Sequence, residues 1–314
     1  MPTLTITHEQ IRDALSRSGY LLEYEVEKIL GRNGYFAQAN QAYPDPITGK
    51  SRELDISAIK AEPITADFHD SIFTIPLIEC VNNPQPIGFF TKNPVAPTTH
   101  MYDLKFSGLP VKVKKGKHWT KLSGFLDMER YHHHCKGRIA TQYCSFTVKK
   151  GTTPTEWLAQ HEELHFDSFN KLCFALNHDI DEHYSHARLQ GKEGINIQTY
   201  YPILVVSGDL IEIVPTKKEI KLRAASHIHY VQSYLTAGKE QRFHIDVVTK
   251  KYLPRLLTTI DRETTRMVHL IRSRKKTVQR SVDLITSSVK SLRSTAAIRS
   301  RMEYRGPWGR HDPS

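Results

Sequence analysis

Two apolar runs in the first third of the chain each contain an acidic residue: residues 52–59 read RELDISAI, and residues 73–83 read FTIPLIECVNN. Both runs are short, rich in β-branched residues and bounded by turn-forming residues, which is typical of β-strands. If the two strands lie side by side, Asp55 and Glu79 point toward one spot. The stretch from Arg52 to Phe90 therefore predicts the centre of a sheet that carries two carboxylates.

Carboxylates inside strands have two interpretations. A buried carboxylate is costly unless it is paired or binds a metal, and oxygen ligands of this kind suit Mg²⁺ or Mn²⁺. Alternatively, Asp55 and Glu79 lie at strand ends and accept hydrogen bonds from the backbone. These two strands, taken alone, leave both interpretations open.

An acidic helical pattern over Gly19–Arg32 precedes the two strands and is followed by Gly34-Tyr35. The order of acidic helix, strand, strand with Asp55 and strand with Glu79 resembles the PD-(D/E)xK nuclease-like superfamily, which has the restriction-endonuclease fold. The resemblance rests on the GY pair, on RELDI and on IEC, and it covers residues 18–90. It implies an α/β fold with a mixed sheet flanked by helices, and metal-dependent hydrolysis of DNA phosphodiester bonds in bacterial defence or DNA processing.

The resemblance also implies roles for individual residues. Asp55, Glu79 and the carbonyl of Cys80 would bind Mg²⁺ or Mn²⁺, and Glu23 would be an outer catalytic carboxylate. Glu23 and Glu27 share a helix face, and the spacing of Glu23 better matches the family glutamate. A solvated acidic face is the alternative for this helix.

One position departs from the family pattern. The family has a lysine two residues after the second acidic residue, where it assists the attacking water, and this sequence has Val81 there. Because strand side chains alternate, Val81 shares a face with Glu79. Asn83, Lys60 or Lys92 would have to replace the lysine. Otherwise catalysis is impaired and the protein is a nuclease-fold scaffold that binds nucleic acid or a partner.

The formal charge of +11 is unevenly distributed. Residues 250–314 hold 16 basic and 5 acidic residues, and residues 105–150 hold 11 basic and 2 acidic residues. Such segments predict a nucleic-acid partner, DNA in preference to RNA, although a basic surface that serves only solubility is the alternative. The predicted nucleic-acid contacts are Lys112, Lys114, Lys115, Lys117, Arg272, Arg274, Lys275, Lys276 and Arg280.

The chain is expected to contain a nuclease-like domain over residues 1–255, with a basic insertion at about 98–150. A basic helical tail is expected over 256–305 and a disordered tail over 306–314. The other predicted elements are a capped helix at Thr7–Arg17, strands at Tyr35–Tyr43, Val111–Val113, Ile139–Val148 and Phe243–Val248, a helix at Thr155–Asn177 and a hairpin at Thr199–Val214 with a Gly-Asp turn.

An apolar seam follows in the tail. Val278, Val282, Ile285, Val289 and Leu292 recur at heptad spacing. The seam is compatible with a homodimer through the C-terminal helix, with packing on the body of the protein, or with a basic helix on DNA.

Two histidine-rich strings raise the question of zinc. His132–Cys135, together with Cys144, offers nitrogen and sulfur ligands, but the spacing fits no common structural zinc site and a polar loop is the alternative. Residues 161–165 read HEELH, which fits a zinc-protease template. We interpret this match as a coincidence, because the inner Glu163 is charged where the helix of that motif is normally uncharged. Asp246, inside a predicted strand, is expected to be structural.

Composition predicts a cytoplasmic protein. No signal peptide is visible after Met1, and no apolar run approaches the ~20 residues that span a membrane. Four scattered cysteines in a chain of 314 residues are typical of reduced thiols in a cytoplasm. A membrane partner is therefore not expected.

Overall fold

A strand that is buried along most of its length runs through the middle of the fold. The computed structural model describes residues 6–66, 69–83, 85–149, 151, 153, 156–160, 163–190, 194–236 and 239–288. In it, nearly every residue of β10 (Asn196–Val206) is buried. A strand without polar alternation needs cover on both faces, as in parallel sheets flanked by helices. Accordingly, β10 pairs in parallel with β3 (Ser71–Val81) on one side and with β14 (Lys239–Thr249) on the other.

The remaining elements extend this centre. The other strands are β1 (Phe36–Pro44), β2 (Ser51–Pro63), β4 (Ile87–Lys92), β5 (Phe106–Leu109), β6 (Lys112–Lys115), β7 (His118–Lys121), β8 (Ile139–Val148), β9 (Trp157–Gln160), β11 (Leu210–Pro215), β12 (Ile220–Ala225) and β13 (His227–Thr236). The helices are α1 (His8–Ser18), α2 (Tyr20–Arg32), α3 (Leu122–Phe125), α4 (Glu163–Gln190) and α5 (Leu253–Ser273), with short 3₁₀ turns η1 (Pro97–Tyr102), η2 (Met128–Arg130) and η3 (His133–Cys135).

The strands form a large mixed sheet. Among the described residues, the main sheet has the order β1-β2-β3-β10-β14-β13-β8-β4-β11-β12, with β5 added to β10 and β9 added to β8. The first three strands are antiparallel to one another, and the central β3, β10 and β14 are parallel. β6 and β7 form a separate two-stranded ribbon. The predicted α/β class, with a mixed sheet flanked by helices, is confirmed.

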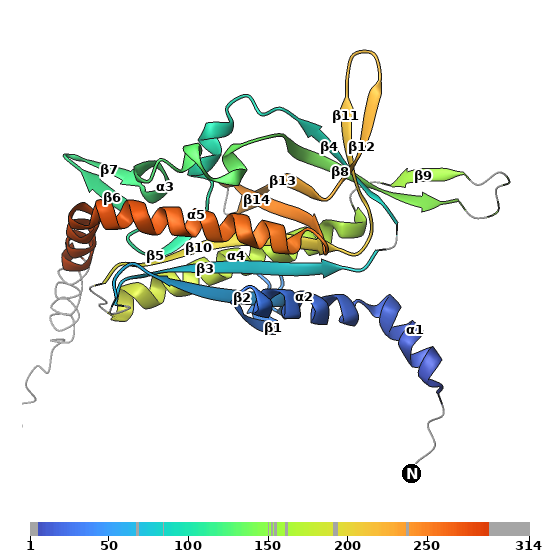
Figure 1. Cartoon of the computed structure of the whole chain (residues 1–314), viewed down its shortest axis with the longest axis horizontal. Coiled ribbons are helices and arrows are strands. Elements are labelled where there is room, and N and C mark those ends of the chain that lie inside the picture. The colour runs from blue at the N-terminus through green and yellow to red at the C-terminus, as the bar shows by residue number, and fades with distance from the viewer. Residues whose placement is uncertain are drawn as a thin grey trace, which may run out of the picture.

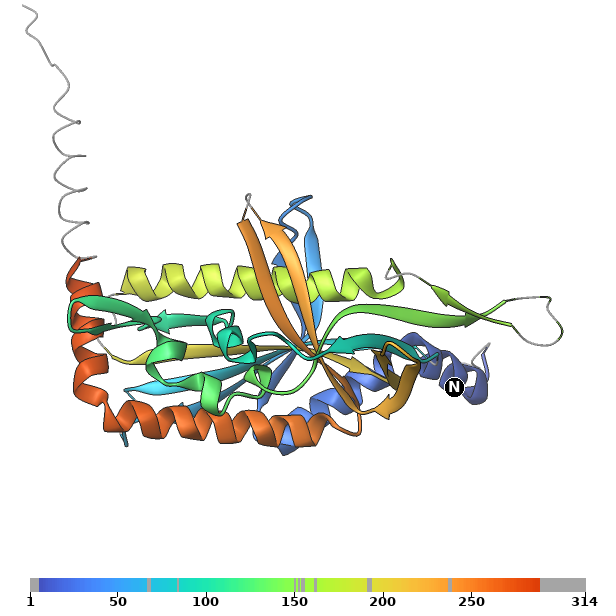
Figure 2. The same ribbon diagram turned by 90° about the horizontal axis from the view of Figure 1, so that it is seen from above.

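Helices cover both faces of this sheet. Figure 2 shows α4 on one side of the strands and α5 on the other. Alternate residues of β14 point to these two sides: Phe243 and Ile245 belong to the core formed with α4, whereas Val248 packs with α2 and α5. Polar residues of β14 between the apolar ones therefore lie inside the protein as well.

Several local predictions are confirmed. Thr7 caps α1, and its hydroxyl and backbone exchange hydrogen bonds with Gln10, so the predicted capping box is present. The acidic helix is α2, and the two runs that contain Asp55 and Glu79 are β2 and β3. None of the described helices is long and apolar enough to cross a lipid bilayer.

The predicted hairpin at Thr199–Val214 is wrong. β10 pairs with β3, β14 and β5, whereas β11 pairs with β4 and β12, so the two strands are not partners. Gly208 lies where the chain passes the end of β3, and an added Cβ would be 2.3 Å from the carbonyl oxygen of Asn83. The glycine is therefore required for a close backbone approach and not for a two-residue turn.

The predicted helix at Thr155–Asn177 begins too early. Trp157–Gln160 is strand β9, which pairs with β8, and α4 begins only at Glu163. All four residues of β9 are exposed, so this segment has no buried helical face and instead extends the edge of the sheet. Thr155 lies outside the described residues.

The segment expected as a basic tail is part of the core over its described length. Leu257 and Ile260 of α5 pack with α2 and β10, and Met267 and Ile271 pack with Val113 and Leu122. α5 is amphipathic, and Figure 1 shows it lying along the sheet. The domain boundary expected after residue 255 therefore falls inside a helix whose buried residues belong to the main fold.

The described part of the heptad seam also packs on the body of the protein. Residues 275–288 are helical, and Val278 and Val282 are fully buried in a cluster with Val113 and Leu122. The backbone N–H of Lys114 donates to the Ser281 hydroxyl at 3.0 Å. These seam positions are therefore buried by residues of the same chain. Val289 and Leu292, and the tail expected at 306–314, lie outside the described residues.

We expect Val278→Ala and Val282→Ala each to lower the free energy of unfolding by about 2 kcal/mol, because each removes buried methyl groups from a packed core. Thr277→Ala, at an exposed position of the same helix, should change it little. Urea unfolding followed by circular dichroism measures the three values. Equal effects at all three positions, or a change of oligomeric state in the valine variants alone, would contradict the packing described.

Candidate metal centre between two strands

Asp55 and Glu79 lie on neighbouring strands at the point where the strands separate. β2 and β3 are antiparallel, and Ile56 pairs with Ile78 as the last matched pair at this end. Beyond it, side chains replace the ladder bonds: the N–H of Asp55 donates to Oε1 of Glu79 at 3.3 Å, and the N–H of Cys80 donates to Oδ2 of Asp55 at 2.7 Å. The two acidic side chains thus bridge the separating strands.

The strand on the other side of Asp55 is also irregular here. Ala39 pairs with Ile56 and Gln41 pairs with Leu54, while Asn40, between them, has a positive φ of 55°. A positive φ is uncommon for a residue other than glycine and marks a local distortion of the strand. The β1 strand is therefore distorted opposite Asp55, although its register with β2 continues on both sides.

Burial makes both carboxylates costly to ionise. Glu79 is only 2% exposed. Burial raises the pKa of its carboxyl to about 8, with a further rise from Asp55 and an opposing effect from Lys171. Burial also raises the pKa of Asp55, against the hydrogen bond from Cys80 and the charge of Lys171. Two carboxylates that repel each other in a buried place are stabilised by a cation between them.

A lysine that sequence reasoning missed completes this site. Nζ of Lys171, on α4, lies 3.2 Å from Oε2 of Glu79. Burial opposes its charge, but Glu79 and Asp55 together raise the pKa of Lys171 above its usual value, so the amine stays protonated. Val81 lies on the same face as Glu79 and packs into the core beneath α4. The structure thus presents an amine at Glu79 from α4 instead of from β3.

Glu23 and Cys80 lie at the edge of the same site. Burial raises the pKa of Glu23, Asp55 raises it further, and Lys171 opposes both, which places this α2 carboxylate within electrostatic reach of the other two. Burial, and then Asp55, raise the pKa of the Cys80 thiol well above its usual value, so the thiol stays protonated and is a poor ligand, whereas the N–H of Cys80 already orients Asp55.

The three expected substitutes for the family lysine have other partners. Lys60 donates to the Asn33 carbonyl and pairs with Asp261 of α5 at 2.9 Å. Asn83 lies 3.3 Å from Nε2 of His165, and Lys92 lines a cavity beside β13 and β14. Among the described lysines, Lys171 is the one that forms an ion pair with Glu79.

The donor set suits a hard divalent cation. Groups of three or more histidine, cysteine or acidic ligands with atoms within 4.8 Å occur elsewhere in the described residues, and neither Asp55 nor Glu79 belongs to one. An ion here would take one or two carboxylates and the Cys80 carbonyl and keep several waters. Mg²⁺ and Mn²⁺ are bound in this way, because they dehydrate reluctantly and prefer oxygen.

The HEELH string does not form a zinc site in the described residues. His165 is buried near the start of α4 and belongs to none of the potential metal groups, and burial lowers its pKa. His161 precedes α4 and lies outside the described residues.

The two basic segments meet on one surface. Lys114 of the β6–β7 ribbon is bonded to Ser281, so the ribbon lies beside the helical residues 275–288. Six of the side chains expected to contact nucleic acid are exposed here and lack a described ion-pair partner. They are Lys112, Lys114, Lys115, Lys117, Lys276 and Arg280. We call these six residues the basic surface.

The other three residues predicted to contact nucleic acid bond to groups of the protein itself. Arg272 donates to the carbonyls of Pro63 and Ile64, and Arg274 donates to the Phe125 carbonyl and pairs with Asp127. Lys275 pairs with the buried Asp70 at 2.8 Å. Their charges hold the C-terminal helices against the body, so they contribute less to an external partner.

Comparison with known proteins found no relatives: no family model, no curated protein and no solved structure matches the chain.

We expect the stability of the metal-free protein to fall as the pH rises from about 4.5 to about 8. Glu79 keeps its proton in the folded protein up to about 8, whereas its usual value is 4.5, so unfolding releases a proton in this window. Glu79→Gln cannot ionise and should exceed the wild type in stability by about 4 kcal/mol at the upper end of the window. At the lower end the two proteins should be alike.

Urea unfolding in the presence of a chelator, at several pH values, checks this expectation. Glu53→Gln, at an exposed position of the same strand as Asp55, is the matched control and should follow the wild type. Added Mn²⁺ should stabilise the wild type most at high pH and leave Glu79→Gln unchanged. A constant difference between wild type and Glu79→Gln at every pH would rule out the buried ionisation.

Proposed function

We propose that the protein is a divalent-metal-dependent nuclease of the PD-(D/E)xK type that hydrolyses DNA phosphodiester bonds, in a cytoplasmic role such as bacterial defence or DNA processing. The observation that carries the proposal is the contact of Lys171 with Glu79 beside Asp55. This contact brings two carboxylates and an amine to one site. The position at which the family has its lysine is Val81 in this sequence.

The order of elements supports the proposal. The acidic helix α2 is followed by β1, β2 with Asp55 and β3 with Glu79; α4 comes only after β4–β9 and α3, and it precedes β10, which returns parallel to β3. The resemblance implied an acidic helix, three strands and a helix beyond. Here α4 covers the sheet face that carries Glu79, so it can supply a side chain to the site.

Each side chain of the site would have a separate role in the reaction. Bound Mg²⁺ or Mn²⁺ would lower the pKa of the attacking water and offset charge on the phosphate. Asp55 and Glu79, with the Cys80 carbonyl, would hold the ion, and the hydrogen bonds that link them would fix their orientation. Lys171 would orient the water and stabilise negative charge that develops on the phosphate. Glu23 would be an outer carboxylate for a water ligand or a second ion.

We expect Asp55→Asn and Glu79→Gln to abolish cleavage of plasmid DNA in Mg²⁺ or Mn²⁺, and Lys171→Met to reduce its rate by about 10²-fold or more. Lys60→Met should cleave at nearly the wild-type rate, because its amine is engaged with Asp261. Gel assays of initial rates on folded variants measure the effects.

A second substitution tests whether the amine itself matters. Val81→Lys in the Lys171→Met background returns an amine to the Glu79 face and should recover part of the lost rate. A Lys171→Met protein as active as the wild type would reject the role of Lys171. No cleavage of any DNA or RNA by the wild type with either ion would reject the nuclease.

A second function has its own support. The basic surface is at the Ser71 end of β3, whereas Glu79 is eight positions along that strand, or about 26 Å away. A protein that only binds nucleic acid, as a catalytically impaired scaffold, would need the basic surface and not Asp55. In both functions nucleic acid, DNA in preference to RNA, is the proposed partner.

We expect Lys112→Ala, Lys114→Ala and Lys117→Ala together to weaken DNA binding and to reduce the slope of log affinity against log salt by about 0.9 for each phosphate that the variant no longer neutralises. The matched control replaces Lys217, Lys218 and Lys221, which are exposed on the β11–β12 hairpin. Fluorescence anisotropy over a salt series measures both. Equal slopes for the two triple variants would place the DNA elsewhere.

A further inference from the structure

Three histidines from distant parts of the sequence meet on the sheet face opposite α4. His229 and His244 lie on the adjacent strands β13 and β14, and His100 lies on η1 of the insertion. Nε2 of His229 is 2.7 Å from Nδ1 of His244, and the rings of His100 and His244 are 4.8 Å apart. One ring nitrogen of each lies within 4.8 Å of the others, and all three residues are more than nine-tenths buried.

The hydrogen bonding of this group is incomplete in either tautomer. Nδ1 of His229 and Nε2 of His244 are buried and have no hydrogen-bond partner within the described part of the chain. A neutral imidazole has one N–H and one lone pair. If His229 donates to His244, the Nδ1 lone pair of His229 and the Nε2–H of His244 remain unsatisfied. If His244 donates instead, the same two atoms remain unsatisfied with their roles exchanged.

The surroundings orient the rings as they would for a metal ion. Nδ1 of His100 is 2.9 Å from the carbonyl oxygen of His134, which only accepts, so Nδ1 carries the proton and Nε2 presents a lone pair. A carboxylate oxygen of Asp103 is 3.6 Å from Nε2 of His244 and can receive its N–H after a small adjustment. Carbonyls and carboxylates in these positions fix the tautomer and direction of metal-binding histidines.

The neighbouring polar network is satisfied by itself. His133 bridges two buried carboxylates, with Nε2 3.1 Å from Asp246 and Nδ1 2.9 Å from Glu263. His134 and His227 also contact Asp246, at 3.0 Å and 2.7 Å. These ligands also lie close enough to hold metal, but here ion pairs and hydrogen bonds already use their atoms. The His100, His229 and His244 group differs, because Nε2 of His229 and Nδ1 of His244 contact only each other among the described residues.

The hypothesis of zinc at His132–Cys135 with Cys144 changes in its sulfur ligands: His132, His133 and His134 belong to potential metal groups with Glu263 or Asp246, whereas neither Cys135 nor Cys144 belongs to one in the described residues. His134 also contacts the three-histidine group, through its carbonyl on His100 and through its ring, which stacks on His229 at 4.5 Å.

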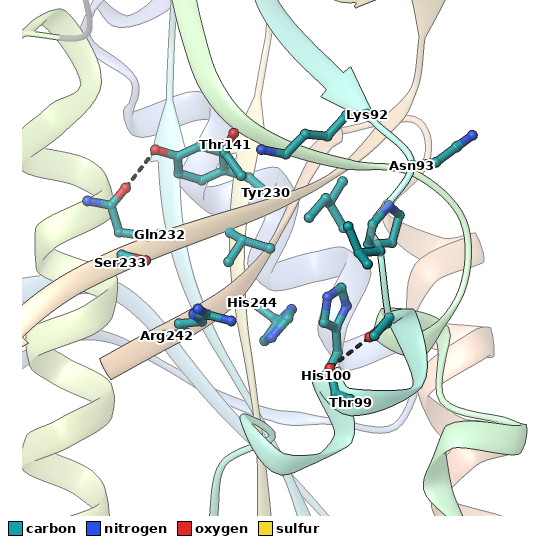
Figure 3. A pocket seen from close by; sticks show the side chains of 15 residues that line it. Lys92, Asn93, Thr99, His100, Thr141, Tyr230, Gln232, Ser233, Arg242 and His244 are labelled. Carbon is teal, nitrogen blue, oxygen red and sulfur yellow. Dashed lines mark hydrogen bonds between the residues drawn. The ribbon is translucent and has the colours of Figure 1, made fainter. Parts of the chain in front are cut away.

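A cavity reaches two of the three histidines, His100 and His244. It has a volume of about 730 Å³, and His100, His244, Arg242 and Lys92 are among its lining residues. Figure 3 shows the rings of His100 and His244 next to each other, with Arg242 beside His244. An ion on the three rings would have an entry path, and one coordination position would remain open to the cavity.

We propose that His100, His229 and His244 bind a transition-metal ion of the zinc class, at a site separate from the oxygen ligands of Asp55 and Glu79. Three imidazoles suit Zn²⁺, whereas Mg²⁺ requires oxygen. The fourth position takes water or a small anion drawn by Arg242 and Lys92. Zn²⁺ sites with three protein ligands and an open position are the arrangement used for catalysis or ligand binding.

The test uses the full-length chain, stripped with a chelator and reloaded with Zn²⁺ or with Co²⁺ as a spectroscopic probe. About one equivalent of either ion should bind, and Co²⁺ should give the visible absorption of a tetrahedral nitrogen site. His100→Gln and His244→Gln should weaken binding at least tenfold and remove this absorption. Asp103→Asn, at a partly exposed residue, should weaken binding about 10-fold to 100-fold through the lost orientation of His244.

Three variants serve as controls. His118→Gln, at an exposed residue of β7, should bind like the wild type, and so should Asp55→Ala, which separates this site from the proposed nuclease centre. His132→Gln changes the neighbouring network. Absence of stoichiometric Zn²⁺ and Co²⁺ binding by folded wild type overturns the proposal. So does a Co²⁺ spectrum that persists in Asp103→Asn and His100→Gln but disappears in His132→Gln.

Discussion

The burial of β10 on both faces is the constraint on which the other parts of the structure depend. Its near-continuous apolar run forces one helix layer on each side of the sheet, and α4 and α5 provide these layers. Each helix also brings a charged residue to the interior: α4 brings Lys171 to Glu79, and α5 brings Glu263 to His133. The two helices that bury the hydrophobic strand therefore also supply the partners of the buried polar groups.

The two faces balance their buried charge differently. On the α5 face, Asp246 and Glu263 are held as carboxylates by histidines, and the charges of these carboxylates outweigh burial and raise the pKa of His133 to about 10. On the α4 face, Asp55 and Glu79 share a single cation, Lys171, and the pKa of Glu79 rises to about 8. The α5 face therefore contains a nearly complete set of ion pairs, whereas on the α4 face Glu79 keeps its proton at neutral pH and Lys171 mainly balances the charge of Asp55. A divalent cation that bound between Asp55 and Glu79 would have to displace this proton.

Local sequence patterns predicted the structural features that depend on residues close together in the chain. The cap at Thr7, the acidic helix and the strands that carry Asp55 and Glu79 follow from neighbouring residues, and each could be read from the sequence. Lys171 could not, because 92 positions separate it from Glu79 and only the packing of α4 on β3 joins them. Val81 gave the one available signal, since a missing amine on a strand face indicates that a covering element must supply it.

The distance between the basic surface and Glu79 bears on how one protein could both hold and cut DNA. Each base pair of a duplex advances about 3.4 Å, so the separation of about 26 Å corresponds to roughly eight base pairs. Under the proposed function, a duplex that contacts the basic surface would have to extend over at least this length of the sheet to reach Asp55 and Glu79. Binding energy would then come mainly from one end of the sheet and chemistry from the other. Because the two sets of residues share no side chain, affinity and cleavage should respond to substitution independently. That independence is also what allows a nuclease fold to lose its chemistry and keep its partner.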